Sequence, residues 1–362
     1  RGSARRLVLD GDTLTDDQLQ IRRLIQADEE GALVIASTDA SEQHLHHVAM
    51  DGTTTRLTHA AGLHTAAAAG PVVVVSSASM QHDLWQTTVM RNGQRAGAIE
   101  NLAEQPTITP SVAFHRAGER RLHSAVLLPS GANPDTPLPV LLDPYAGPHA
   151  QRVLKSRTPL GVSQWFADQG FAVVITDGRG TPGRGPAFER AVWGDLAQPV
   201  LDDQLAALDH VALEYPGMDL DRVGIRGWSF GGYLAALALL RRPDRFHAAV
   251  AGAPVTDWRL YDTHYTERYL GHPDTHPEHY ERTNLTAEAE QLTRPLLLIH
   301  GLADDNVVVA HTLKLSRALL EAGRPHQVLP LSGITHMTPQ EVVAENLLLL
   351  QATFLRDALG DA

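Results

Sequence analysis

Short apolar runs that alternate with helical segments dominate the chain beyond residue 110. We expect strands at six such runs: residues 139–142, 171–176, 222–225, 248–251, 296–299 and 327–331. Between the second and third run, four apolar residues share one helical face: Leu201, Leu205, Leu208 and Val211. This alternation predicts an α/β fold, with a mostly parallel sheet covered by helices on both faces.

The last helical segment carries its own start signal. Residues 338–341, TPQE, form a capping box with proline at the first helical position, so we expect the helix to open at Thr338. Four apolar residues then fall on one stripe: Val343, Leu347, Leu350 and Phe354.

The first hundred residues contain a repeat with a period of about forty residues. The run LVIAS at 33–37 has a counterpart in VVVSS at 73–77, and VAMDG at 48–52 has one in VMRNG at 89–93. Asp-Gly and Asn-Gly are typical turn dipeptides between adjacent antiparallel strands. The period is that of a four-stranded propeller blade.

Two blades cannot close a propeller, which typically needs about four to eight. We therefore expect residues 1–105 to be the last part of a truncated β-propeller and residues 106–362 to be the α/β domain, with the linker EQPTITP at 104–110. The chain begins with neither Met nor an apolar signal core, so we expect it to be a piece of a longer protein.

Composition excludes several classes of function. The net charge of -12 argues against nucleic acid binding, and no apolar run is long enough to span a membrane. The chain has no cysteine, which excludes disulfides, thiolate metal sites and a cysteine nucleophile. This absence fits a reducing compartment, and we expect a cytoplasmic protein.

A lone serine lies between glycines where the third apolar run meets a helical segment. The motif GWSFGGY at 227–233 places Ser229 at this junction. A serine on a sharp strand-to-helix turn needs small neighbours, and the turn exposes its hydroxyl at a helix N-terminus. The alternative is a glycine-rich tight turn with an incidental serine.

A nucleophilic serine needs a base, and the hydrolase order is Ser, Asp, His. Asp304 and Asp305 follow the run 296–299, and His336 follows the run 327–331. The sequence does not choose between the two aspartates. His300 is a rival base, but its place at the end of a buried strand favours a structural role.

Five motifs in this order resemble the prolyl oligopeptidase family, in its dipeptidyl peptidase IV-like branch. They are DPYAGP at 143–148, DGRG at 177–180, GWSFGGY at 227–233, YTERY at 265–269 and HGLADDN at 300–306. The resemblance covers roughly residues 105 to 345 and implies an α/β-hydrolase domain that follows a β-propeller.

The resemblance also implies the catalytic roles. Ser229 would be the nucleophile, His336 the general base and acid, and Asp304 the residue that orients His336. The Tyr145 hydroxyl and the backbone N–H of Phe230 would form the oxyanion hole. Losing one such donor typically costs about 2.7–4 kcal/mol of transition-state stabilisation.

The same resemblance implies a flat apolar pocket for a proline ring, formed by Tyr261, Tyr265, Trp258, Val255 and Val307. Asn306 would bind the carbonyl of the residue before that proline. For the two tyrosines, ordinary helix packing at a spacing of four residues is the alternative.

We therefore expect a serine peptidase that cleaves after proline or alanine near a peptide N-terminus, without a cofactor. The expected substrate is a peptide with proline at its second position, and the resemblance allows a homodimer. One alternative is an acylaminoacyl-releasing hydrolase or an esterase on the same fold. Another is a catalytically silent interaction module in this form of the chain.

Three further patterns favour a structural interpretation. The run GRGTPG at 178–183, with Asp202 and Asp203 downstream, fits a dinucleotide fingerprint formally, but Pro182 and the loop after it oppose a helix start. Family members of this branch bind the substrate N-terminus with paired glutamates on the propeller. Here Glu29 and Glu30 directly precede a strand and indicate a solvated turn instead.

Two histidine clusters suggest metal binding only weakly, and no metal site is expected. His44 and His46 would share one strand face, while His47 would point away. His272, His276 and His279 lie in a sequence that we interpret as a proline-broken loop. In both clusters we expect solvent-exposed histidines.

Overall fold

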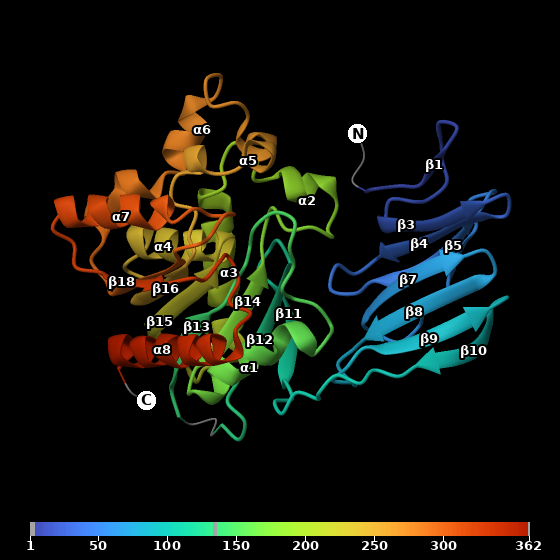
Figure 1. The fold of residues 1–362 in the computed structure, drawn as a ribbon, viewed down its shortest axis with the longest axis horizontal. Coiled ribbons are helices and arrows are strands. Elements are labelled where there is room, and N and C mark those ends of the chain that lie inside the picture. Colours follow the sequence, from blue (N-terminus) through green and yellow to red (C-terminus); the bar gives the residue numbers. More distant parts are fainter. Residues whose placement is uncertain (1–3, 133–135, 361–362) are drawn as a thin grey trace. The chain divides into compact units, whose positions relative to one another are not determined.

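The computed structural model describes residues 4–132 and 136–360 (Figure 1), which form two units. The smaller unit runs to Pro110 and includes two later segments, Val153–Val162 and Thr181–Glu189. The larger unit contains Ser111–Arg152, Ser163–Gly180 and the chain from Arg190 onward. The boundary that we expected after residue 105 did not include these two returning segments.

Two four-stranded antiparallel sheets make up most of the smaller unit. The first consists, in order, of β3 (Gln20–Asp28), β4 (Gly31–Ser37), β5 (His44–Ala49) and β6 (Thr54–Arg56). The second consists of β7 (Leu63–Ala69), β8 (Val72–Ala78), β9 (Gln86–Arg91) and β10 (Gln94–Ile99). A short ribbon, β1 (Val8–Leu9) with β2 (Asp12–Thr13), precedes them.

The sequence repeat corresponds to equivalent strands of the two sheets. The run 33–37 lies in β4 and its counterpart 73–77 lies in β8, each the second strand of its sheet. The dipeptides Asp51-Gly52 and Asn92-Gly93 form the turns between the third and fourth strands, as predicted. Residues of both sheets, including Ile35, Leu45 and Ala66, bury a shared apolar cluster.

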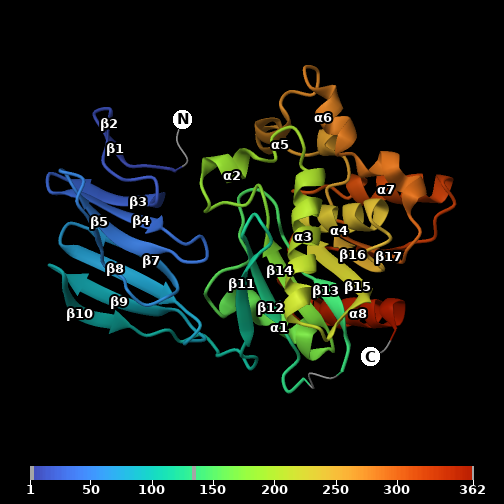
Figure 2. The same ribbon diagram turned by 180° about the vertical axis from the view of Figure 1, so that it is seen from behind.

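An eight-stranded sheet forms the centre of the larger unit (Figure 2). Its order is β11 (Val112–Ala117), β12 (Leu122–Leu127), β14 (Ala172–Asp177), β13 (Leu138–Leu142), β15 (Met218–Trp228), β16 (Ala248–Gly252), β17 (Leu296–Gly301) and β18 (Gln327–Leu331). The six strands from β13 to β18 run parallel to one another, and all six were predicted. β11 and β12 pair antiparallel at one edge and were not predicted.

Helices cover both faces of this sheet. In the described residues, the α-helices are α1 (Gly161–Asp168), α2 (Pro186–Arg190), α3 (Gln198–Glu214), α4 (Phe230–Arg241), α5 (Thr263–Leu270), α6 (Pro277–Arg282), α7 (Ala310–Glu321) and α8 (Glu341–Leu359). The 3₁₀ helices of the same residues are η1 (Thr158–Leu160), η2 (Trp258–Leu260) and η3 (Leu285–Gln291). α3 and α4 lie on one face, and α8 lies on the other (Figures 1 and 2). Within the described parts of the chain, we find no helix with the length and apolar character needed to span a bilayer.

The predicted start of the last helix is wrong. α8 begins at Glu341, and its N-cap residue Gln340 has extended backbone and no side-chain capping bond. The carbonyl of His336 accepts a hydrogen bond from the Trp228 indole, and this tertiary contact holds the preceding loop in place of a helical turn. Local capping signals are weak enough for such a contact to override them.

The predicted stripe of α8 is correct only in part. Leu347 is buried, whereas Leu350 is 40% exposed. The buried side of the helix consists of Leu347, Gln351, Ala352, Leu355 and Leu359. Packing against β15 and β16 selects this face, which is rotated from the most apolar one.

Candidate active site

Ser229 lies on a strained turn between a buried strand and a buried helix. β15 ends at Trp228 and α4 begins at Phe230, and Ser229 between them has φ 59° and ψ -117°. Its backbone N–H donates to the carbonyl of Gly252, 2.9 Å away. A Cβ at Gly227 would lie 2.2 Å from the backbone of Gly231, so only glycine fits beside this turn. The positive φ of Ser229 is a strained backbone conformation, and the surrounding structure maintains it.

His336 and Asp304 form a hydrogen-bonded pair. His336 Nδ1 donates to Asp304 Oδ2 over 2.7 Å. The other carboxylate oxygen of Asp304 accepts the backbone N–H groups of Asn306 and Val307, at 3.0 and 2.8 Å. The carboxylate is buried, and these three hydrogen bonds satisfy both of its oxygens.

Trp228 connects the serine turn with the histidine loop. Its indole Nε1 donates to the backbone carbonyl of His336 over 2.8 Å. The indole also packs on Gly252, where any Cβ would lie 2.0 Å from the ring. Because Trp228 directly precedes Ser229, this bond fixes the backbone of His336 relative to the serine. Sequence reasoning did not identify Trp228 as a functional residue.

The structure also separates the rival residues. Asp305 is exposed, whereas Asp304 makes the bond to His336. His300 uses both ring nitrogens in the core, at 2.7 Å from the hydroxyl of Thr312 and 2.7 Å from the carbonyl of Val307. Burial lowers the pKa of His300 below its usual value. These contacts fit the structural role predicted for it.

Tyr145 follows β13 in a loop at the carboxyl ends of the parallel strands. Its ring packs against Phe230 and His149, with centroids 6.1 and 5.9 Å away. Burial raises the pKa of the Tyr145 hydroxyl far above its usual value, so this group remains a proton donor. The first N–H groups of α4 have no partner within the helix and are available at the same turn.

A buried ion cluster anchors the start of this loop, and sequence reasoning missed its role. The carboxylate of Asp143 accepts hydrogen bonds from Arg226 over 2.7 Å, from Arg152 over 2.9 Å and from the Ser163 hydroxyl over 2.7 Å. Burial alone would raise the pKa of Asp143, but the two arginines outweigh it and the pKa is lowered. The sequence signal for this cluster was the aspartate two residues before Tyr145, but the sequence does not show that Arg152 and Arg226 pair with it.

The residues predicted for the proline pocket come together as one aromatic cluster. Tyr265 stacks on Trp258 at 6.0 Å and 14°, and Tyr261 meets both rings edge-on. The Tyr261 hydroxyl donates to Asn306 Oδ1 over 3.3 Å. Val255, Val307 and Trp258 are almost fully buried. The accessible surface therefore belongs to the two tyrosines and Asn306.

The nucleotide-like loop has a structural explanation. Asp203 on α3 is fully buried and accepts the backbone N–H of Arg179 over 2.7 Å and its side chain over 3.0 Å. Asp203, one of the two acids that a dinucleotide site would use to bind a ribose, is thus already bonded to Arg179 within the chain. Glu29 and Glu30 lie in the exposed turn between β3 and β4, as predicted.

The prediction of solvent-exposed histidines is wrong for His44 and His46. Their exposed fractions are 3% and 6%, because the neighbouring sheet covers this face of β5. His44 Nε2 lies 2.8 Å from Glu42, and the His44 ring lies 5.1 Å from that of His64. In the second cluster the prediction is correct only in part. His272 is exposed and residues 272–276 lie outside the helices, but Pro277 opens α6, because proline suits the first helical position, and His279 on this helix is buried.

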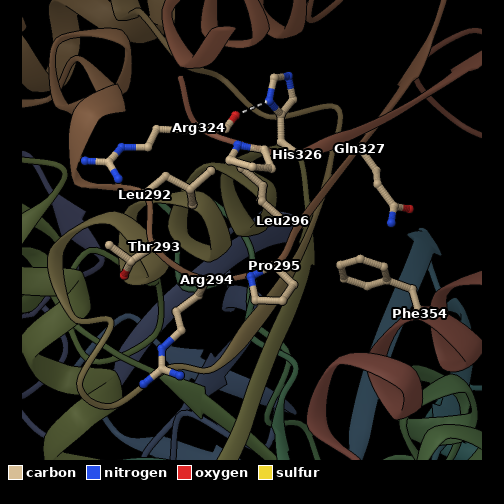
Figure 3. A pocket seen from close by; sticks show the side chains of 10 residues that line it. Leu292, Thr293, Arg294, Pro295, Leu296, Arg324, His326, Gln327 and Phe354 are labelled. Atoms are coloured by element: carbon tan, nitrogen blue, oxygen red, sulfur yellow. Dashed lines mark hydrogen bonds between the residues drawn. The ribbon is translucent and has the colours of Figure 1, made fainter. Parts of the chain in front are cut away.

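A pocket of about 500 Å³ lies at the other end of the sheet from the serine turn (Figure 3). Its walls come from the segments that lead into β17 and β18, including Pro295, from Gln327 at the start of β18, and from Phe354 on α8. His326 bonds to the carbonyl of Arg324 at its rim. None of the three residues Ser229, Asp304 and His336 lines this pocket.

The parallel sheet with its serine at a strand-to-helix turn defines the α/β-hydrolase class. Residues 160–362 match the model of the prolyl oligopeptidase family. The chain belongs to this family of serine peptidases.

Individual relatives agree with this assignment. The chain is 38% identical over 276 residues to dipeptidyl peptidase 8 of Mus musculus, covering 73% of this chain and 30% of that protein. It is 34% identical over 214 residues to prolyl endopeptidase FAP of Mus musculus, covering 58% and 28%. The structure of Porphyromonas gingivalis dipeptidyl peptidase 4 matches with a TM-score of 0.89 and 26% identity, over 96% of this chain and 51% of that chain. This chain spans less than a third of the two curated relatives.

Proposed function

We propose that the chain hydrolyses peptides by acyl transfer to Ser229. The observation that carries this proposal is the hydrogen bond from His336 Nδ1 to Asp304 Oδ2. With its proton on Nδ1, the neutral imidazole presents the lone pair of Nε2 as a base for the serine hydroxyl. The buried carboxylate then stabilises the imidazolium that forms.

The oxyanion would be stabilised by two donors of different kinds. The Phe230 N–H lies at the start of α4, where the helix dipole favours negative charge. The Tyr145 hydroxyl stays protonated because burial raises its pKa. His336 would next protonate the leaving amine, and water would hydrolyse the acyl-enzyme by the same steps in reverse order.

The aromatic cluster supports cleavage after proline, or after the smaller alanine. A proline ring offers no polar group, and the half-buried rings of Tyr261 and Tyr265 suit it. The Nδ2 amide of Asn306, whose Oδ1 accepts the Tyr261 hydroxyl, would donate to the carbonyl of the residue before that proline. The relatives named dipeptidyl peptidase support release of N-terminal dipeptides from peptides with proline second, and the relative named prolyl endopeptidase supports internal cleavage.

We also propose that the two antiparallel sheets of the smaller unit are blades of a β-propeller. Each has four strands in sequential order, and the repeat places them in tandem. A homodimer and a cytoplasmic location stay predictions of the sequence.

Covalent labelling with a fluorophosphonate probe tests the nucleophile. We expect mass spectrometry to locate the label on Ser229, and Ser229→Ala to remain unlabelled. A folded sample without label would contradict the proposal. Free and N-terminally capped Gly-Pro substrates then separate dipeptide release from internal cleavage, and capped acyl substrates test the acylaminoacyl alternative.

A further inference from the structure

Two histidines and a glutamate meet at the start of α6, outside the catalytic constellation. One nitrogen or oxygen atom from each of His276, Glu278 and His279 lies within 4.8 Å of the other two. His276 Nδ1 is 3.7 Å from Glu278 Oε1, and His279 Nε2 is 3.5 Å from the same atom. Both distances are longer than a hydrogen bond, so the three atoms lie near one another without bonding directly.

The spacing of these atoms suits a small divalent cation. Ligands at about 2.0–2.1 Å from a tetrahedral zinc ion lie about 3.3–3.4 Å from one another. The two measured separations are a few tenths of an ångström larger. Small side-chain movements would therefore bring the atoms to coordination distance.

His279 is already oriented as a ligand. Its Nδ1 donates to the carbonyl of Leu270, 2.8 Å away at the end of α5. This bond leaves the lone pair on Nε2, in the way that backbone carbonyls orient metal-binding histidines. At Gly194, which has φ 80°, a Cβ would lie 3.0 Å from His279 Nε2. The glycine keeps the space beside this nitrogen open.

His276 has to move for one ion to reach both rings. The two imidazoles are stacked at 5° with centroids 4.8 Å apart. Their lone pairs therefore lie in two separate parallel planes, and one ion does not lie in both planes. The His276 side chain is 37% exposed and can rotate. Trp193 contacts both rings edge-on, at 5.7 and 5.1 Å, and will sense this rotation.

We propose that His276, Glu278 and His279 bind one Zn²⁺ or a chemically similar transition-metal ion, with water completing the coordination. Two imidazoles and one carboxylate are ligands that suit Zn²⁺, Cu²⁺ or Ni²⁺. Mg²⁺ and Ca²⁺ prefer sites in which every ligand atom is oxygen. All three ligands lie at the N-cap or in the first turn of α6, and the hydrogen bond from His279 Nδ1 to Leu270 connects the site with the end of α5, the helix that carries Tyr265. The site does not depend on the proposed peptidase function.

The test is a titration of the chelator-treated full chain with Zn²⁺, followed by calorimetry and tryptophan fluorescence. We expect one ion per chain, a change in fluorescence and a higher thermal midpoint, with no competition from excess Mg²⁺. His276→Gln and Glu278→Gln should each weaken binding by about tenfold or more. His264→Gln, an exposed histidine on α5, is the matched control and should bind like the original chain.

Trp193→Phe should retain binding and lose most of the fluorescence change. Both ligand variants alter accessible side chains, so folding is expected to survive, and the thermal midpoint without metal checks this. The absence of a saturable site, or equal affinity in the two ligand variants and the control, would overturn the proposal. Equal binding of Mg²⁺ would overturn its chemical class.

Discussion

At the scale of single residues, one hydrogen bond from Trp228 links the turn of Ser229 with the loop of His336. Ser229 and His336 belong to loops that are far apart in the sequence, and the indole of Trp228 spans them. Neutral hydrogen bonds contribute about 0.5–1.5 kcal/mol to stability, but a small displacement of a catalytic base lowers the rate much more. Trp228 is therefore a positioning residue whose effect should appear in turnover.

We expect Trp228→Phe to lower kcat about tenfold with little change in KM, because the aromatic packing remains and the bond to His336 is lost. Steady-state kinetics measure both parameters, and the thermal midpoint controls for folding. Trp165→Phe on α1 is the matched control and should retain full kcat. Equal kcat in the two variants would refute the positioning role.

Tyr145→Phe removes one hydroxyl and keeps the ring contacts with Phe230 and His149. If the hydroxyl stabilises the oxyanion, kcat should fall about 10²–10³-fold, or roughly 2.7–4 kcal/mol. The free energy of unfolding should stay within about 0.5 kcal/mol of the original value. A loss confined to KM would instead place Tyr145 in substrate binding.

At the scale of elements, the site depends on strand ends that several buried contacts fix. Arg226 on β15 reaches Asp143 after β13, and its guanidinium also lies 4.3 Å from the Phe166 ring of α1. Arg152 brings a second guanidinium group to the same carboxylate. The cluster joins two strands and one helix just before the loop that carries Tyr145.

Asp143→Asn should reduce the free energy of unfolding by about 3 kcal/mol or more, because it removes the counter-charge of the largely buried Arg226 and the half-buried Arg152. Denaturant unfolding measures this, and Asp221→Asn, at an exposed position of β15, should change little. The folded pKa of Asp143 is lowered, so its contribution is present above the unfolded pKa of about 3.9 and is lost as pH falls through the folded value. Equal stability of the two variants at neutral pH would contradict the role of the cluster.

At the scale of the whole molecule, buried neutral histidines set the response to acid. Burial lowers the pKa of five of them, which lie in both units: His44, His46, His64, His300 and His311. Burial lowers the pKa of His311 to about 4. In the unfolded chain the same groups titrate near their ordinary value of about 6.5.

Stability should therefore be complete above about pH 6.5 and should fall between that value and about pH 4. In this window the unfolded chain binds protons that the folded histidines do not. The shift of His311 alone corresponds to about 3 kcal/mol. Denaturant unfolding at several pH values measures the slope. His311→Asn should flatten it, whereas exposed His264→Gln should not, and a flat profile in the original chain would refute the account.

Several features could be predicted because they are local. The parallel strands from β13 to β17 are short apolar runs that are mostly buried, and β18 at the edge of the sheet is an apolar run as well, although it is largely exposed. β11 and β12 escaped prediction because mixed sequence such as Val112–Ala117 becomes a strand only by pairing at a sheet edge. The start of α8 was wrong because the bond from Trp228 to the His336 loop overrides the capping signal at Thr338.

The sequence by itself determined the strand-and-helix alternation, the repeat of the smaller unit and the residue types of the site, because each depends on local period or on chemistry at fixed spacing. Tertiary structure decided which aspartate bonds His336, which face of α8 is buried, and that His44 and His46 lie inside. It also brought His276, Glu278 and His279 around one space. These outcomes depend on contacts between segments distant in the chain, and burial and bond geometry exist only once those segments pack.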